Sequence, residues 1–318
     1  MKGPLPIVVH HRHLLLGLLI FTLGAAPPVS SETVKIAPNP DYEASGKHHF
    51  WFGKGYRDLW TTPVELEVLD LEKEAGGLTV VRRVGGMQTP GLALKGADGR
   101  SYTFRWIDKD PSRLLPEEWR DTVVADYFRD QTANSHPGVW PVFMGILEKL
   151  EWAPYTHQRL MVMPDIPELG EHREIFAGAV GSFGEYPMPA HDGVPGFRGA
   201  TEIISSKRLW DRWRENPKNR IDSQIFIRAR LFDLWTGNWD RHRSQWRWAW
   251  IPDRELWIPI PEDPDQAFAD YSGLVLRMAR WQLPIFQEFK DQIGGMEGMT
   301  MNGADVDRWL LSDLDRED

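Results

Sequence analysis

The chain has 318 residues, 42% hydrophobic and 12% aromatic, which is enough to bury a sizeable core in one large or two small domains. Because it contains no cysteine, disulfides, thiolate zinc sites and a cysteine nucleophile are excluded. A formal net charge of −9 argues against a partner with a phosphate backbone, so we expect no nucleic-acid binding.

Residues 1–31 are typical of an export signal. Lys2 and Arg12 supply a positive start, and a short apolar run follows from Leu14 to Leu23. Since a membrane span needs roughly 20 apolar residues, we expect cleavage rather than an uncleaved anchor, and no transmembrane helix afterwards. Cleavage removes two basic residues and no acidic one, which changes the net charge from −9 to −11. The protein is therefore expected in the periplasm or cell envelope.

Residues 32–54 are polar and interrupted by proline and glycine, which predicts a flexible or draped leader. The next hundred residues favour strands, because apolar residues alternate with polar ones or form short runs. Strands are predicted over residues 64–71, 78–84, 92–95, 102–109 and 160–163.

A glycine-rich turn, residues 85–91, separates two of these strands. Glycine lets backbone N–H groups approach a phosphate closely, although most turn glycines only satisfy a positive φ. The strand over 102–109 carries Arg105 and Lys109 on one face, and either cation suits a phosphate. A solvent-facing Arg105 is the alternative.

Helices are predicted in the remainder of the chain. One starts near Pro116 and ends before Pro137, because Glu117 and Glu118 suit the positive end of its dipole. Residues 166–200 are rich in glycine and proline and predict a long irregular connection. Further helices are expected over 207–215, 225–235 (with Asp222 as N-cap and Gly237 as terminator), 274–293 and 304–313.

Residues 246–261 predict a β-hairpin, since Trp246, Trp248 and Trp250 alternate with other residues before the turn at Pro252-Asp253. A hairpin places its two ends side by side. Oxygen-bearing side chains flank both ends, so we expect a site for a hard cation such as Mg²⁺ or Mn²⁺. These side chains are Asp240 and Gln245 before the hairpin and Asp263 and Asp265 after it.

This arrangement resembles a kinase active site. An Asp followed by a metal ligand five residues later, then a hairpin and a second Asp, is the order in protein kinases. Asp240-Arg241-His242 is most similar to the Asp-Arg-His of phosphoinositide kinases and secretory-pathway casein kinases, and the chain also resembles HipA-type kinases. Their second motif often has a Phe five residues after the Asp, an interval that Asp263 and Phe268 keep.

The resemblance extends to an exported bacterial envelope module that sometimes precedes a surface-antigen outer-membrane barrel. Its second motif runs Arg-Asp-Arg-Asp-Gln-Ala-Phe, whereas Glu262 and Pro264 stand here at the two arginine positions. That departure puts in doubt whatever those arginines do.

The resemblance implies an α+β, two-lobed protein-kinase-like fold with a small β-rich N-lobe (55–165), a hinge (166–200) and a mostly helical C-lobe (201–318). It implies that Asp240 is catalytic and orients or deprotonates an acceptor hydroxyl, while Asp263 and Gln245 hold the metal, with Asp265 as a further ligand. The implied nucleotide-binding residues are Gly85, Gly86, Gln88, Thr89, Arg105, Lys109, Asp130 (which orients the cation) and Glu185 (at the hinge).

The implied function is that of an atypical kinase, which transfers phosphate from ATP or another nucleoside triphosphate with Mg²⁺ or Mn²⁺. The acceptor is a hydroxyl of a protein, lipid or glycan, and an outer-membrane barrel is an expected partner. The alternative is a catalytically inactive kinase-like binding or assembly module, because an exported protein meets little ATP. A metal-dependent hydrolase using the same acids and a tryptophan-lined sugar-binding surface also remain open.

Overall fold

The strands form two sheets. The computed structural model describes residues 31–86, 88–290 and 295–312. The larger sheet has seven strands in the order β1-β2-β6-β7-β5-β4-β3. It is mixed, because β2 and β6 run parallel while the other neighbouring pairs run antiparallel. The bounds are β1 Thr33–Ile36, β2 Val64–Val68, β3 Leu78–Val84, β4 Gly91–Gly96, β5 Ser101–Trp106, β6 Gln158–Val162 and β7 Val180–Tyr186.

The smaller sheet contains the predicted hairpin, which is confirmed. Its order is β10-β9-β8, with bounds β8 Glu202–Ser205, β9 Trp246–Ile251 and β10 Leu256–Pro261. Trp250 pairs with Trp257, and Trp248 and Trp246 pair with Pro259 and Pro261. Proline cannot donate to a strand ladder, so its place on the edge strand β10 fits its chemistry.

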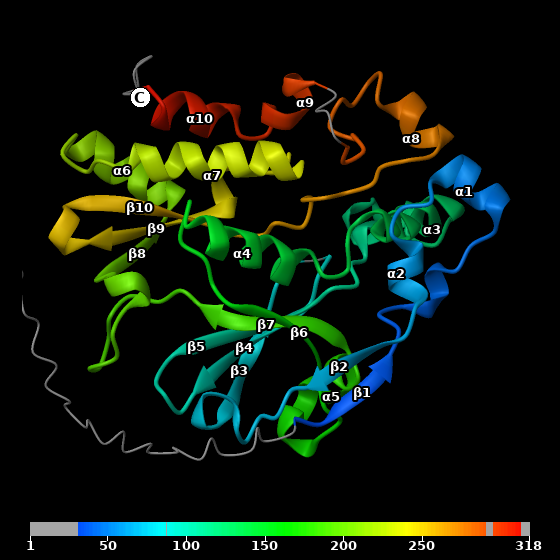
Figure 1. The fold of residues 1–318 in the computed structure, drawn as a ribbon, viewed down its shortest axis with the longest axis horizontal. Coiled ribbons are helices and arrows are strands. Elements are labelled where there is room, and N and C mark those ends of the chain that lie inside the picture. Colours follow the sequence, from blue (N-terminus) through cyan, green and yellow to red (C-terminus); the bar gives the residue numbers. More distant parts are fainter. Residues whose placement is uncertain (1–30, 87, 291–294, 313–318) are drawn as a thin grey trace, which may run out of the picture. The chain divides into compact units, whose positions relative to one another are not determined.

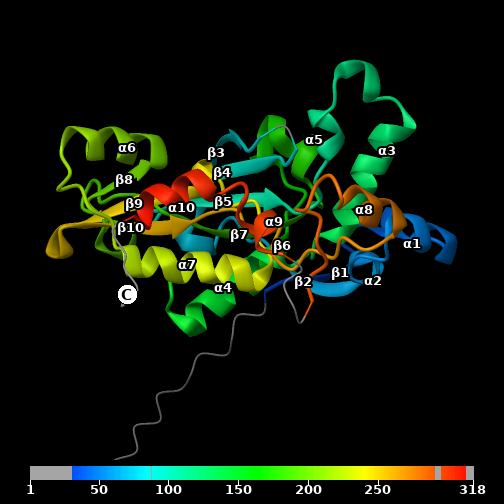
Figure 2. The same ribbon diagram turned by 90° about the horizontal axis from the view of Figure 1, so that it is seen from above.

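Ten helices occur in the described part of the chain: α1 Gly46–Phe52, α2 Arg57–Thr61, α3 Val123–Asp130, α4 Val139–Leu150, α5 Arg173–Phe176, α6 Ser206–Glu215, α7 Ser223–Thr236, α8 Leu274–Ala279, α9 Met296–Thr300 and α10 Ala304–Leu310. Within residues 32–318, α7 lies between the hairpin and α10, and the seven-stranded sheet forms the opposite part (Figure 1). Figure 2 shows the same elements from above. The chain is therefore α+β.

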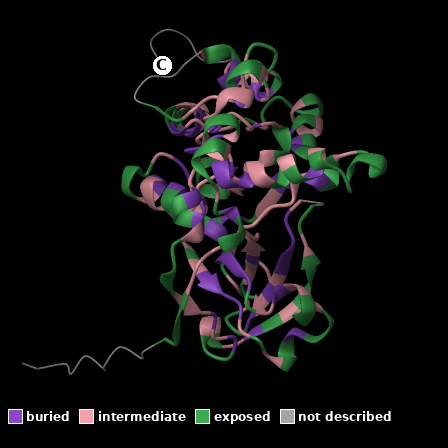
Figure 3. Cartoon of the chain, turned by 90° about the vertical axis from the view of Figure 1, so that its right-hand side faces the viewer, coloured by how far each residue is buried: buried purple, intermediate pink, exposed green. Residues whose placement is uncertain are grey.

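The two largest hydrophobic clusters hold the helices and sheets together. The first joins α4, α7, α10 and the hairpin around Phe143, Phe226, Trp246 and Trp248. The second covers one face of the seven-stranded sheet around Leu92, Phe104 and Phe176. In Figure 3, buried segments accordingly occur on the sheet strands and among the packed helices.

Helix α7 follows its sequence signals closely. The side chain of Asp222 accepts a hydrogen bond from the Ile225 amide at 3.0 Å, and Gly237 ends the helix with a left-handed φ of 74°. Helix α6 also agrees with the predicted 207–215. The α7 capping explains why residues 238–245 leave the helix at a fixed point and turn toward the hairpin.

Strand β7 is the main difference from the sequence-based expectation. Residues 166–200 were predicted to be irregular, but β7 lies inside that range and pairs with both β5 and β6. Its Gly181 and Gly184 stand where an added Cβ would collide with Phe104 and with Gln158. Glycine in this strand marks close side-chain approach, whereas the sequence pattern favoured a loop.

Other boundaries also differ. Residues 32–54, predicted to be a flexible leader, contain β1, which pairs with β2, and α1. Strand β5 ends at Trp106, before Lys109. The helix expected from Pro116 starts only at Val123 after a short 3₁₀ turn. The last two predicted helices are shorter, as α8 and α10, and their final predicted residues (291–293 and 313) lie outside the described residues.

The contacts divide the chain into residues 1–31 and 32–318, and the fold above is that of the second unit. Residues 1–30 of the expected export signal lie outside the described residues. None of the helices in the described ranges has the length and apolar character needed to cross a membrane.

Candidate functional site

A cleft of about 560 Å³ lies between the seven-stranded sheet and the hairpin. Its lining comes from β3, β4, β5 and β7 on one side and from residues 244–263 on the other. Six of the predicted site residues line it: Gly85, Gly86, Arg105, Glu185, Gln245 and Asp263.

Two cations, one on β5 and one just after it, meet the acids that follow the hairpin at one end of this cleft. Arg105, on β5, places Nη2 2.8 Å from Asp263 Oδ2 and 3.4 Å from Asp265 Oδ2. Lys109 also forms an ion pair with Asp265. Trp140 donates its indole N–H to Asp265 Oδ1 at 2.7 Å, and Arg105 lies over the Trp140 ring. The paired cations and acids are 156 to 160 positions apart in the sequence.

Burial acts on both acids, and the neighbouring cations make their pKa values unequal. Burial and the neighbouring charge of Asp265 raise the pKa of Asp263 to about 6, although Arg105 acts in the opposite direction. Burial also opposes ionisation of Asp265, but Lys109 and Arg105 outweigh it and hold the pKa of Asp265 well below its usual range. Asp265 is therefore the acid that stays ionised, and the ionised form of Asp263 is the one that the site disfavours.

The same two acids differ in their capacity to bind a metal. Asp263 Oδ1 is buried without a hydrogen-bond partner, and its residue has a left-handed φ of 50°. Both oxygens of Asp265 are engaged, one by Trp140 and the other by Lys109. In this arrangement Asp265 anchors Lys109 instead of offering an open ligand.

The described residues contain no group of three or more His, Asp or Glu that would hold a metal by themselves. Mg²⁺ is commonly bound by one or two carboxylates, with waters and substrate phosphates completing its shell. The unpartnered oxygen of Asp263, with the Gln245 side chain on the same cleft wall, fits that kind of site.

Asp240 is positioned differently from the other candidates. Its Oδ1 accepts a hydrogen bond from Asn302 Nδ2 at 2.8 Å, and it is not among the residues that line the cleft. Burial raises the pKa of Tyr271, and the charges of Asp240 and Asp265 both add to that rise, so the two carboxylates act on the same hydroxyl. His242 contacts Ser244 at 2.8 Å.

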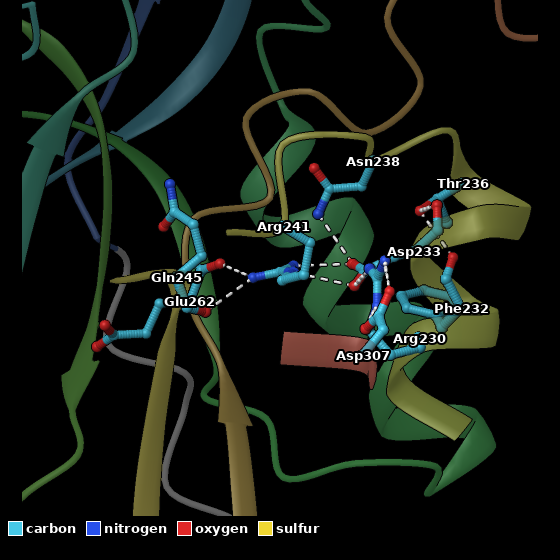
Figure 4. Close-up of polar contacts among 9 residues, drawn as sticks. All are labelled: Arg230, Phe232, Asp233, Thr236, Asn238, Arg241, Gln245, Glu262 and Asp307. Atoms are coloured by element: carbon cyan, nitrogen blue, oxygen red, sulfur yellow. Dashed lines mark hydrogen bonds and ion pairs between the residues drawn. The ribbon is translucent and has the colours of Figure 1, made fainter. Parts of the chain in front are cut away.

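A buried ion-pair network fixes the Asp240 loop, and sequence reasoning missed it (Figure 4). Asp233 of α7 accepts hydrogen bonds from Arg230, from Asn238 and from two nitrogens of Arg241, each at 2.9 Å. Arg241 then donates to the backbone carbonyls of Gln245 and Glu262, one at each end of the hairpin. Arg230 and Asp233, opposite charges three residues apart in a largely apolar helix, were the available sequence signal.

The glycine-rich turn is partly held by the fold. Gly85 has a φ of 94°, and a Cβ there would collide with the carbonyl oxygen of Thr89. Gly86 faces open space. Thr89 is buried, and the Gln88 carbonyl accepts a hydrogen bond from the Asp110 amide at 2.9 Å. Gly85 therefore shapes the turn, while Gly86 is the residue free to approach a ligand.

Two predicted residues have other partners. Glu185 lines the cleft and pairs with Arg100 at 3.1 Å. Asp130 pairs with the buried Arg57 at 2.7 and 2.8 Å and with His48 at 2.9 Å, and neither Arg105 nor Lys109 contacts it. The structure thus places Asp130 away from the cation that it was expected to orient, and Asp265 takes that place.

Scans against protein-family models and against curated proteins give no match for this chain. The function is therefore inferred from the residues and their geometry.

Proposed function

We propose that this chain is a metal- and nucleotide-dependent phosphotransferase with a two-lobed kinase-like fold, acting in the cell envelope. The cleft is the proposed site for ATP or another nucleoside triphosphate. The export signal expected at residues 1–31 supports the envelope assignment, and the order glycine turn, cation strand, catalytic Asp, hairpin, metal Asp supports the kinase-like fold.

The single observation that carries the proposal is the meeting of Arg105 and Asp263 at 2.8 Å beside the glycine-rich turn. Phosphoryl transfer depends chiefly on positioning and on neutralising charge. A cation from one sheet and an acid with an unpartnered oxygen from the other are the groups that a phosphate chain and its metal would contact.

Each residue then has a distinct role. Arg105 and Lys109 would bind phosphate oxygens, and Asp263 with Gln245 would hold Mg²⁺ or Mn²⁺, which neutralises developing charge on the phosphates when bound. Asp240 would accept the proton of the acceptor hydroxyl while the oxygen of that hydroxyl bonds to the γ-phosphorus. The bond from that phosphorus to the bridging oxygen breaks, and a nucleoside diphosphate leaves.

A second candidate function is a non-catalytic binding or assembly module. It is favoured by one specific observation: the cations are already paired with the acids, while Asn302 holds Asp240 outside the cleft lining. A cleft whose charges satisfy one another can remain stable without ligand.

Nucleotide binding with Mn²⁺ tests both candidates. Thermal shift and release or transfer of the γ-phosphate would be measured for the wild type, Asp263→Asn and Asp240→Asn. Asp253→Asn, on the exposed far turn of the same hairpin, is the matched control. The phosphotransferase predicts that Asp263→Asn loses the Mn²⁺-dependent shift, and that Asp240→Asn keeps binding but loses transfer. If the wild type shows no shift with any nucleotide, the non-catalytic module is supported.

A further inference from the structure

A second cavity, of about 360 Å³, adjoins the cleft along the same face of the hairpin. The β9–β10 register puts Ala249 opposite Ile258 and Arg247 opposite Ile260, so these residues share the face turned away from the tryptophans. The cleft uses the Arg247–Ile260 end of that face, and the second cavity uses the part nearer the turn. Ile260, Pro154 and Tyr155 line both.

The lining of this second cavity is mostly apolar. Its largest apolar lining residues are Trp152, Tyr155, Phe197, Ile225, Ile251 and Ile258. Its volume falls at the lower end of ligand pockets, which span roughly 300–1,000 Å³. A compact apolar group therefore fits the cavity by size and by chemistry.

Arg198 supplies a positive charge at the edge of this cavity. Its guanidinium lies 4.6 Å from the centre of the Tyr155 ring and 6.0 Å from that of Phe197. Among the described residues it forms no ion pair or hydrogen bond, and it is exposed. The other arginine of the lining, Arg254, is already bound to Asp222. Arg198 is thus the positive charge available to a ligand, and Glu151 is the one acidic residue of the lining.

The backbone holds Arg198 in an unfavourable conformation. Its φ of 54° and ψ of 26° are left-handed, a region that costs a non-glycine residue on the order of 1 kcal/mol or more. Glycine would adopt these angles without strain. Strain of this kind is concentrated at ligand sites, where it fixes a side chain in place.

We propose that this cavity binds a small amphiphilic anion, with its hydrocarbon part against Phe197 and Ile258 and its carboxylate or phosphate head on Arg198. The inference goes beyond the phosphotransferase and requires neither nucleotide nor metal. Apolar burial supplies most of the affinity, and the charge-assisted hydrogen bond selects the anion.

Calorimetric titration of the nucleotide-free chain tests the proposal with decanoate, decyl phosphate and decanol, each below its micelle-forming concentration. The wild type should bind at least one of the two anions about tenfold more tightly than decanol, the ratio expected for roughly 1.4 kcal/mol from one charged hydrogen bond. The tighter of the two anions identifies the head group.

Arg198→Gly is the decisive variant, because it removes the charge and also the backbone strain. It should melt at least as high as the wild type, yet bind the anion about tenfold more weakly and decanol unchanged. Arg83→Gln, which removes an exposed charge outside both cavities, is the control and should bind like the wild type. Equal anion affinity in Arg198→Gly and wild type, equal affinity for decanol and both anions, or no binding by the wild type would each overturn the proposal.

Discussion

Arg241 and Asp233 form a bidentate ion pair, with both N···O distances at 2.9 Å and both side chains removed from solvent. The same Asp233 also binds Arg230, whose guanidinium is shared with Asp307, so Asp233 is the carboxylate that links the two buried guanidinium groups. The loop that carries Asp240 therefore depends on a residue that does not line the cleft.

Asp233→Ala should lower the free energy of unfolding by about 3–5 kcal/mol, since it leaves the buried Arg241 without its carboxylate partner, whereas Arg230 keeps Asp307. Urea unfolding measures the change. Asp211→Ala, which breaks an exposed pair with Lys207, is the control and should cost less than about 1 kcal/mol. Similar losses in the two variants would contradict the assigned role of the network.

Asp263→Asn should raise the melting temperature at neutral pH even though it removes a proposed metal ligand. Asparagine tolerates the left-handed φ of 50°. Because burial raises the pKa of Asp263 to about 6, its ionisation destabilises the folded state as pH rises from about 4 through 6. The melting temperature of Asp263→Asn should therefore match the wild type near pH 4 and exceed it at pH 8. A variant less stable than the wild type at pH 8 would contradict this.

Asp130→Asn should show the opposite pH dependence. Burial opposes the charge of Asp130, but hydrogen bonds from Arg57 and His48 outweigh it and keep its pKa below the usual range. The ionised Asp130 therefore stabilises the folded state fully above the pKa of about 4 that it has in the unfolded chain. This contribution is lost as pH falls through the lower pKa that Asp130 has in the folded state. The free energy of unfolding of the wild type should exceed that of Asp130→Asn by about 3 kcal/mol at pH 7. Urea unfolding at several pH values should show this difference shrinking in acid. A gap independent of pH would refute the ion-pair account.

Gly85→Ala and Gly86→Ala form a matched pair in the glycine-rich turn. Gly85→Ala should lower the free energy of unfolding by about 1–3 kcal/mol, because of its positive φ and the collision with Thr89. Gly86→Ala meets open space and should change it by less than about 0.5 kcal/mol. Chemical denaturation of both variants checks the prediction, which fails if Gly86→Ala is the more damaging.

The sequence was informative where local chemistry decides the structure. The capping of α7 by Asp222 and Gly237 and the Trp-rich hairpin follow from local patterns, so both were predictable. Arg105 and Asp263 were each assigned to the site through the resemblance to kinases, but their ion pair was not predicted, because no local pattern links residues 158 positions apart. The ion pair of Asp130 with Arg57 could not be predicted either, because the two residues are 73 positions apart. Arg57 also lies just after residues 32–54, for which the sequence predicts a flexible leader.

Strand β7 also decides where this chain can be divided. Composition alone puts a boundary at residue 165, yet β7 lies after it in the sequence and between β6 and β5 in the sheet. A fragment ending at 165 would lack the strand that joins β1-β2-β6 to β5-β4-β3, and each group would expose an unpaired edge prone to aggregation. Separate expression of the large sheet should therefore extend at least through Tyr186.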